Sequence, residues 1–188
     1  MALRVITLTD SEMLTLWKLR SLLEPLGTGA ETVCADGIDI DTLLRQRIDD
    51  WYYTCLATAP VDSLPLTELS ATLTARRTTD GAGAVSLPEG LLRVASVELE
   101  GWERPATVTD DPQSALALAQ SNPYSRGRCS VPVAVAFTRS STLLLYTPPE
   151  GEIRIRSLKA VMRPPEGTYT PTDRMLATMP CDPSATGL

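Results

Sequence analysis

Side chains that could catalyse a reaction are few in this sequence, and their spacing matches no common catalytic arrangement. The chain contains no histidine, so the most frequent general base near neutral pH is missing. A serine nucleophile would need a carboxylate or a lysine as its base, and Lys18 and Lys159 are the only lysines. The pairs Asp49 with Asp50 and Asp110 with Asp111 are adjacent in sequence, and adjacent residues do not share a helix face. The sequence therefore predicts a protein that is not an enzyme.

The cysteines are too scattered to indicate a metal site. Cys34, Cys55, Cys129 and Cys181 contain no CxxC pair among them, whereas zinc sites usually combine closely spaced thiols with further thiols or imidazoles. We therefore expect no metal and no cofactor. Buried free thiols in a reducing compartment are the preferred interpretation, and the sequence leaves open whether any of the four is paired.

The net charge argues against a protein whose main task is to bind nucleic acid. It is −6, with a pI of about 4.7, and an acidic surface repels the phosphate backbone. The main basic cluster is Arg154, Arg156 and Lys159, and strand alternation would place the two arginines on one face. No aromatic stacking platform accompanies them. We therefore interpret this cluster as a contact with another subunit or with a DNA channel.

Neither a secretory signal nor a membrane span is predicted. The first residues, MALRVITLTD, reach polar side chains too early for a signal peptide. No apolar run approaches the roughly 20 residues that a membrane-spanning helix needs. We expect a protein made in a cytoplasm and without a membrane partner.

Two helices are predicted in the first third of the chain. TDSE, at residues 9–12, has the spacing of a capping box, and apolar residues follow at helical intervals until the segment ends near Pro25. The second helix begins where Asp39 or Asp41 can cap it, and it ends at Pro60. Its apolar positions are Leu44, Ile48, Trp51, Tyr52, Cys55 and Ala59.

After residue 60 the apolar residues alternate instead of following helical spacing. Residues 66–79 alternate apolar side chains with Thr and Ser, which is typical of a strand with one solvent-facing side. A short helix is expected over residues 111–120, with Asp111 as its cap and Pro112 in its first turn. Further strands are expected at 84–88, 91–102, 104–110, 131–139, 141–149 and 151–163.

These elements predict an α+β fold in three parts. Residues 1–60 form a helical part. Residues 61–163 form an antiparallel β-sandwich or small barrel, because sequential short strands with tight turns pair as neighbours, and this domain carries the helical insertion near 111–120. Residues 164–188 form an extended, proline-rich C-terminal arm.

Two groups of side chains are candidates for contacts with other proteins. Tyr169, Met175 and Leu176 make the arm more apolar than a purely solvating tail, so we expect them to dock it on a neighbouring subunit. Trp102, beside a glycine at a strand end, and Tyr124, in a loop, are candidates for exposed aromatic contacts.

The order of these features resembles the head–tail adaptor or tail-tube (ring) proteins of short-tailed bacteriophages, of the podovirus and crAss-like type. The likeness covers residues 39–163. It rests on the succession SLPEGLLRVASVELEGWERPATV, DPQSALALAQSNPYSRGRCSVPVAVAF and STLLLYTPPEGEIRIRSLKAVMRPP. In these segments LP precedes a strand, an aromatic residue follows it, and NP and Gly precede the next strand.

The resemblance implies a structural virion protein, assembled in the cytoplasm of the bacterial host. It implies a homo-oligomeric ring of about twelve copies, a dodecamer, that binds the portal protein and tail proteins. Genomic DNA would pass through the ring without sequence-specific binding, since an acidic channel wall offers no strong phosphate contacts.

Two other functions remain open on sequence grounds. One is a monomeric β-sandwich binding module for carbohydrate or a cell-surface partner, with Trp102, Tyr124 and Tyr146 as contacts. The other is a hydrolase with an unusual base, which an activity-based serine probe would label.

Overall fold

The computed structural model describes residues 3–21 and 39–180, which contain helices and strands in two compact units. The helical unit is drawn from Met1–Pro65 and Pro164–Leu188, and the β-unit is Leu66–Arg163. The fold is therefore α+β, as the sequence predicts. In sequence, the β-unit lies between the two segments that form the helical unit.

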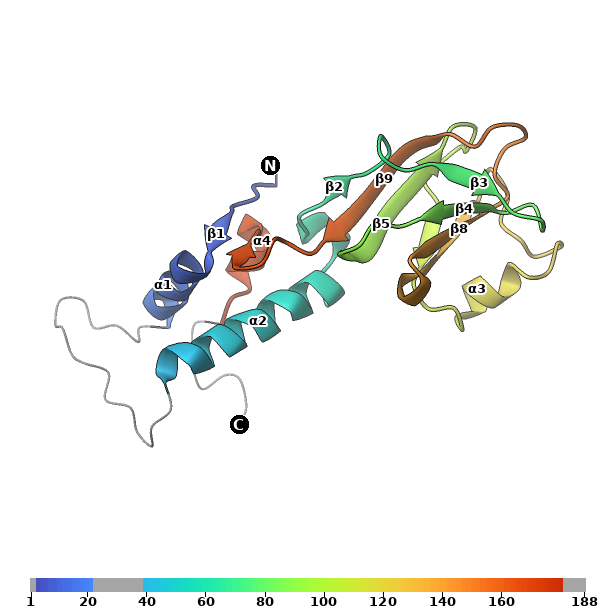
Figure 1. Ribbon diagram of the computed structural model, residues 1–188. Helices are drawn as coiled ribbons and strands as arrows, with labels where there is room; N and C mark the ends of the chain where they lie inside the picture. Colours follow the sequence, from blue (N-terminus) through green and yellow to red (C-terminus); the bar gives the residue numbers. More distant parts are fainter. Residues whose placement is uncertain (1–2, 22–38, 181–188) are drawn as a thin grey trace. The chain divides into compact units, whose positions relative to one another are not determined.

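Local capping signals set the starts of the two long helices in the helical unit (Figure 1). Helix α1 (Asp10–Arg20) begins at the predicted capping box, in which Thr9 N donates to Glu12 Oε2 at 2.8 Å and Glu12 N donates to Thr9 Oγ1 at 3.4 Å. Helix α2 (Ile40–Thr58) begins at Asp39, whose carboxylate accepts from Asp41 N. Both predicted starts are confirmed. The expected end of the first helix near Pro25 lies outside the described residues.

The C-terminal segment differs from the predicted extended arm. Strand β10 (Thr168–Tyr169) pairs with β1 (Leu8–Thr9), and helix α4 (Asp173–Ala177) follows, capped by Thr172 Oγ1. In the N-terminal part of the same unit, a short 3-10 helix, η2 (Val61–Ser63), follows α2. The segment folds because its apolar residues, Met175 among them, are buried and Thr172 supplies a helix cap. Pro164 and Pro165 precede β10 and Pro171 precedes α4, so these prolines do not keep the segment extended.

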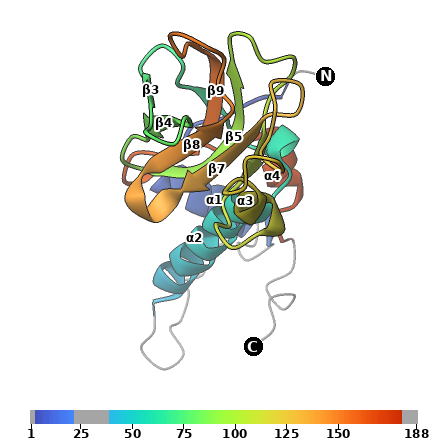
Figure 2. The ribbon, with the colours of Figure 1, turned by 90° about the vertical axis from the view of Figure 1, so that its right-hand side faces the viewer.

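The β-unit consists of two sheets. One has the strand order β2-β9-β5 and the other β3-β4-β8-β7-β6; Figure 2 shows β4, β8 and β7 side by side. The strands of the first sheet are β2 (Thr67–Glu68), β5 (Leu91–Leu99) and β9 (Ile155–Met162). Those of the second are β3 (Ala75–Arg77), β4 (Gly83–Ser86), β6 (Thr107–Thr109), β7 (Val133–Phe137) and β8 (Thr142–Tyr146). Helix α3 (Ala115–Ala119) and the 3-10 helix η3 (Thr138–Ser140) complete the unit.

The two sheets share one hydrophobic core. Val97 and Leu158 from the first sheet and Val85, Leu143 and Leu145 from the second are fully buried in the same cluster. Over the described strands, neither sheet closes into a barrel. The core is formed mainly by Leu, Val and Ala side chains, as expected from a chain with one phenylalanine.

The strand pairing departs from the sequence expectation in two places. Residues 66–79 form two short strands, β2 and β3, which belong to different sheets, because a turn in which Thr72 N donates to Leu69 O carries the chain from one sheet to the other. In addition, β6 pairs with β7 in parallel, so the second sheet is mixed. Helix α3 supplies the connection between these two strands that parallel pairing requires.

The alternation expected along β5 is also interrupted. Its register with β9 shifts between Val94 and Ser96, and a bulge of this kind changes which side chains face the core. As a result Val94, Val97 and Leu99 are buried together. Strict alternation would place Val94 and Val97 on opposite faces, so the bulge is what brings both into the core.

Helix α3 begins later than the sequence predicts. Ser114 is its N-cap and accepts from Ala117 N at 3.3 Å. Asp111 instead accepts from Gln113 N at 2.9 Å, which forms a turn before the helix.

Glu68 joins β2 to β9 through its carboxylate. Oε1 accepts from Leu158 N at 2.7 Å and from Ser70 N at 3.1 Å, and Oε2 accepts from Ser157 Oγ at 2.7 Å. Burial by itself raises the pKa of Glu68, but the three hydrogen bonds prevail and lower it to about 2. The folded protein therefore favours the ionised form.

Replacing Glu68 with glutamine is expected to remove a pH-dependent part of the stability. A carboxyl with a depressed folded-state pKa stabilises the fold above its unfolded value of 4.5 and loses this contribution as pH falls towards 2. Because the side chain is exposed, solvent screening reduces the contribution to about 1 kcal/mol. Urea unfolding at several pH values should show the unfolding free energies of the wild type and of Glu68→Gln converging as the pH falls from 4.5 to about 2. A constant difference across that range would contradict the assignment.

Gly101 occupies a turn that has no room for a side chain. Its φ is +90°, and a Cβ there would lie 2.8 Å from Pro149 Cγ. Gly151 has a similar φ of +85°, but a Cβ there would meet no atom within 4 Å. A side chain at either position would therefore strain the backbone, but only at Gly101 would it also meet a neighbouring atom.

Gly101→Ala is expected to destabilise the β-unit more than Gly151→Ala. Both substitutions cost about 1–2 kcal/mol for the left-handed backbone, and Gly101→Ala adds about 1–3 kcal/mol because Pro149 must move. Thermal unfolding of the two variants measures the difference. Equal losses of stability would mean that the contact with Pro149 relaxes without cost.

Candidate functional site

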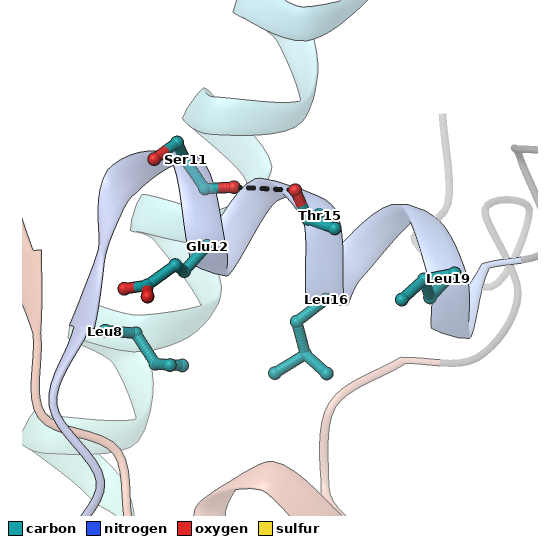
Figure 3. Close-up of a pocket in the computed structure, with 6 residues that line it drawn as sticks. All are labelled: Leu8, Ser11, Glu12, Thr15, Leu16 and Leu19. Carbon is teal, nitrogen blue, oxygen red and sulfur yellow. Dashed lines mark hydrogen bonds between the residues drawn. The ribbon is translucent and has the colours of Figure 1, made fainter.

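A shallow apolar groove runs along one side of α1 in the helical unit (Figure 3). It has a volume of about 410 Å³. The residues that line it, here called the α1 groove, are Leu8, Ser11, Glu12, Thr15, Leu16 and Leu19. Figure 3 shows Leu8, Glu12, Leu16 and Leu19 directed to the same side of the helix.

The groove exists because α1 has two apolar sides. Met13 and Trp17 are buried, at 0% and 5% exposure, whereas Leu19 is 50% exposed. A surface helix normally needs only one apolar stripe. Helical spacing in the sequence groups Leu16 with Met13 and Trp17, and it does not single out Leu19. The density of apolar residues at positions 13, 14, 16, 17 and 19 is the signal that could have identified the second stripe.

One charged side chain lies in the α1 groove. Glu12 accepts hydrogen bonds from Thr9 N and from Thr9 Oγ1, both at 2.8 Å and both on Oε2. These bonds, the one from the backbone foremost, lower the pKa of Glu12 below its ordinary value. The groove therefore combines an apolar surface with a fixed negative charge, which suits an apolar side chain accompanied by a cation.

A second exposed apolar feature lies on the β-unit, after α3. It is the Tyr124 loop (residues 121–125), in which the tyrosine side chain is 94% exposed. Leu118 and Val131, on either side of this loop in the sequence, are 55% and 49% exposed.

Hydrogen bonds hold the base of the Tyr124 loop. Gln120 is only 1% exposed; its Oε1 accepts from Gly127 N and its Nε2 donates to Leu116 O, both at 2.8 Å. Arg126 Nε donates to Gln120 O at 2.9 Å. Inside the loop, Tyr124 N donates to the side chain of Asn122 at 3.0 Å. The loop is therefore a fixed support that presents one aromatic side chain to solvent.

The Tyr124 loop also has a positive charge nearby. Arg126 lies over the Tyr146 ring, 5.6 Å from its centroid, and donates to Asp80 O at 3.0 Å. Within residues 112–137, Arg126 and Arg128 are the only charged residues.

The predicted basic cluster lies on the surface and is balanced by carboxylates. Arg154 Nη2 lies 2.9 Å from Glu152 Oε2, and Arg156 Nη1 lies 2.8 Å from Glu98 Oε1. The two arginine side chains are 64% and 58% exposed, and Lys159 is exposed as well. Their role as a subunit or channel contact stays a prediction.

The residues predicted to dock the arm on a neighbouring subunit are buried in this chain instead. Tyr169, Met175 and Leu176 are 7%, 2% and 8% exposed within the helical unit. The Tyr169 hydroxyl donates to Asp49 Oδ1 at 2.6 Å, and its ring packs against Tyr52 with the centroids 5.1 Å apart. Burial, and then this hydrogen bond, raise the pKa of Tyr169. These side chains therefore attach the C-terminal segment to its own helices.

Trp102 is buried, contrary to the expectation that it is exposed. Its side chain is 3% exposed, and Nε1 donates to Thr147 O at 3.1 Å. The Tyr146 side chain is also buried, at 9% exposure. The alternative of a carbohydrate-binding module therefore retains Tyr124 as the one exposed aromatic residue of its three proposed contacts.

The two cysteines that the structure describes, Cys55 and Cys129, are free thiols. Burial raises the pKa of Cys55. Cys34 and Cys181 lie outside the described residues. Within residues 3–21 and 39–180, no three His, Cys, Asp or Glu side chains gather in a way that could hold a metal ion.

Comparisons with known proteins give no family for this chain. No model of a known protein family matches it, and no similar curated protein was found. In the described parts of the chain, no helix combines the length and apolar character that crossing a bilayer requires.

Proposed function

We propose that the protein is a structural virion protein that forms a homo-oligomeric ring between the head and the tail of a short-tailed bacteriophage. In this role the ring is a dodecamer that binds the portal protein and tail proteins, and genomic DNA passes through it without sequence-specific binding. It assembles in the host cytoplasm, needs no cofactor and is not an enzyme. The two sheets of the β-unit around one core support a β-sandwich, the domain type that the sequence resemblance implies.

The observation that carries the proposal is the presence of two different exposed apolar features, one on each unit. They are the α1 groove, which is concave, and the Tyr124 loop, which projects. A ring of identical subunits needs heterologous contacts, in which two different surfaces of the same chain meet. A protein with one concave and one projecting apolar surface supports contacts of this kind.

The charge distribution also supports contact between unlike parts of neighbouring copies. The sequence of the helical unit has six Lys or Arg against thirteen Asp or Glu, a net charge of −7. The sequence of the β-unit has eleven Lys or Arg against ten Asp or Glu, a net charge of +1. Like-charged helical units repel one another, so a helical unit packs more favourably on a β-unit.

The proposal is tested by the assembly state of the full-length chain. Negative-stain electron microscopy and mass photometry of the purified protein, alone and with portal protein, should reveal rings. A chain that stays monomeric at every concentration and does not associate with portal protein would contradict the proposal. A signal on a glycan array from such a monomer would favour the binding-module alternative.

Charge reversal at Arg154 and Arg156 is expected to impair assembly with little loss of stability. Exposed ion pairs contribute about 0–1 kcal/mol, so the thermal unfolding of Arg154→Glu/Arg156→Glu should stay close to that of the wild type. The matched control is Arg156→Glu combined with Glu98→Lys, which restores the ion pair inside the chain and keeps the net charge but exchanges the positions of the two charges. If rings persist in Arg154→Glu/Arg156→Glu, these arginines are not part of the subunit contact.

A further inference from the structure

We propose that the Tyr124 loop of one copy inserts its tyrosine into the α1 groove of the next copy. This inference rests on the proposed homo-oligomeric ring and identifies the two surfaces that form its repeated contact. The occupant of the α1 groove is then a second copy of this chain.

The chemistry of the groove fits a tyrosine side chain. Leu8, Leu16 and Leu19 give an apolar surface for the ring. The Glu12 carboxylate accepts its two Thr9 hydrogen bonds on Oε2, so Oε1 is placed to accept one from the tyrosine hydroxyl. An aromatic ring with a polar tip, inserted in an apolar groove, is a frequent anchor of protein interfaces.

The charges of the two surfaces are complementary. Glu12 is the only charged residue among those that line the α1 groove, and it belongs to the acidic helical unit. On the other surface, Arg126 and Arg128 lie two and four residues after Tyr124, and no acidic residue lies within residues 112–137. Opposite charges at the rim of an apolar contact favour correct encounter and fix its orientation.

Both surfaces are organised before they meet. Buried Gln120 holds the base of the Tyr124 loop through Gly127 N and Leu116 O. On the other side, the Thr9–Glu12 capping box holds the start of α1 and the position of the Glu12 carboxylate. Surfaces that are already ordered lose less conformational entropy on association.

The contact is directional, because a β-unit surface of one copy meets a helical-unit surface of another. After each contact, one terminal copy still has a free α1 groove and the other terminal copy a free Tyr124 loop, so the same contact repeats. Repetition of a heterologous contact yields a closed ring when the rotation per copy allows closure.

Two single variants remove one surface each. Tyr124→Ser removes the anchor, and Leu19→Lys places a cation in the groove near the incoming arginines. Since Tyr124 and Leu19 are 94% and 50% exposed, circular dichroism should show that both variants keep the folded secondary structure. Mass photometry should report at least about a 10-fold weaker association for each variant. The matched control is Leu43→Gln, a substitution of another exposed helical leucine, 43% exposed and outside the groove, and it should assemble like the wild type.

Mixing the two variants tests the pairing itself. The Tyr124→Ser chain retains its groove and the Leu19→Lys chain retains its loop, so an equimolar mixture should contain one intact contact. Sedimentation velocity should then detect heterodimers in the mixture and monomers in each variant alone. Rings should not form, because the remaining loop and groove in each heterodimer are both defective.

The outcomes separate this inference from the proposed function. Wild-type rings together with unimpaired Tyr124→Ser rings would overturn the inference and leave the ring proposal standing. Impaired variants whose mixture contains no heterodimer would also overturn it, since the loop would then contact another surface. A wild-type chain that never assembles, with or without portal protein, would overturn both.

Discussion

Replacing Tyr52 with alanine is expected to lower the free energy of unfolding of the helical unit by about 3–5 kcal/mol. Tyr52 is fully buried, and its ring packs against that of Tyr169. Its hydroxyl accepts from Thr170 N at 3.0 Å and lies 3.1 Å from Thr170 Oγ1. The substitution therefore leaves a cavity and also weakens the attachment of the C-terminal segment. Urea unfolding followed by the helical circular-dichroism signal measures the loss.

Two further variants separate the contributions at this site. Tyr52→Phe keeps the ring and removes the hydroxyl, so it should cost about 1–2 kcal/mol. Tyr53→Ala changes the next residue on the same helix, which is 41% exposed, and should cost less than about 1 kcal/mol. If Tyr52→Ala and Tyr53→Ala destabilise the unit equally, Tyr52 does not hold the two halves of the helical unit together.

Replacing Trp102 with alanine is expected to destabilise the β-unit by a similar amount, about 3–5 kcal/mol. The indole is 3% exposed and belongs to the core cluster shared by the two sheets. Its Nε1 donates to Thr147 O, a carbonyl that would lose this partner. Thermal unfolding of the purified variant measures the effect.

Tyr124→Ala is the control for Trp102→Ala, because it removes another large aromatic side chain from the same unit. With 94% of its surface exposed, this tyrosine should change the unfolding free energy by no more than about 0.5 kcal/mol. The measurement belongs at a concentration below that of assembly, since association also stabilises the folded chain. A large loss of stability in Tyr124→Ala would mean that the loop is part of the core.

The features that sequence predicts well are those determined by neighbouring residues. The capping box at Thr9 and Glu12 and the cap at Asp39 depend on contacts within three residues, and both are found as expected. The change from helical to alternating spacing after residue 60 likewise marks where strands begin. The coarse α+β fold follows from these local signals.

The predictions that were wrong concern residues whose partners lie far away in the sequence. Trp102 is buried in the core cluster of the two sheets, and its indole hydrogen is accepted by Thr147, 45 residues away in sequence. Tyr169 is buried by contacts with Asp49 and Tyr52, more than a hundred residues earlier. A local pattern identifies such residues as apolar or as turn neighbours, but it does not identify their partner.

The candidate site illustrates the same limit. Tyr124 was recognised from its place in a loop, because exposure of a turn residue between Asn122, Pro123 and Ser125 is a local property. The α1 groove was not recognised. Its existence depends on which side of the helix is covered by α2 and by the C-terminal segment, and only tertiary packing decides that.

The insertion of the β-unit within the helical unit has a consequence for the newly made chain. During translation, all of Leu66–Arg163 emerges before Tyr169, Met175 and Leu176 are available to complete the helical core. The β-unit, a contiguous segment, can then fold on the ribosome first, although domains usually fold in order from the N-terminus. The first segment of the helical unit therefore completes its packing last. A polypeptide that terminates prematurely after residue 163 would carry Tyr124 but would lack a completed α1 groove. In the proposed ring, such a fragment would end a growing assembly instead of extending it.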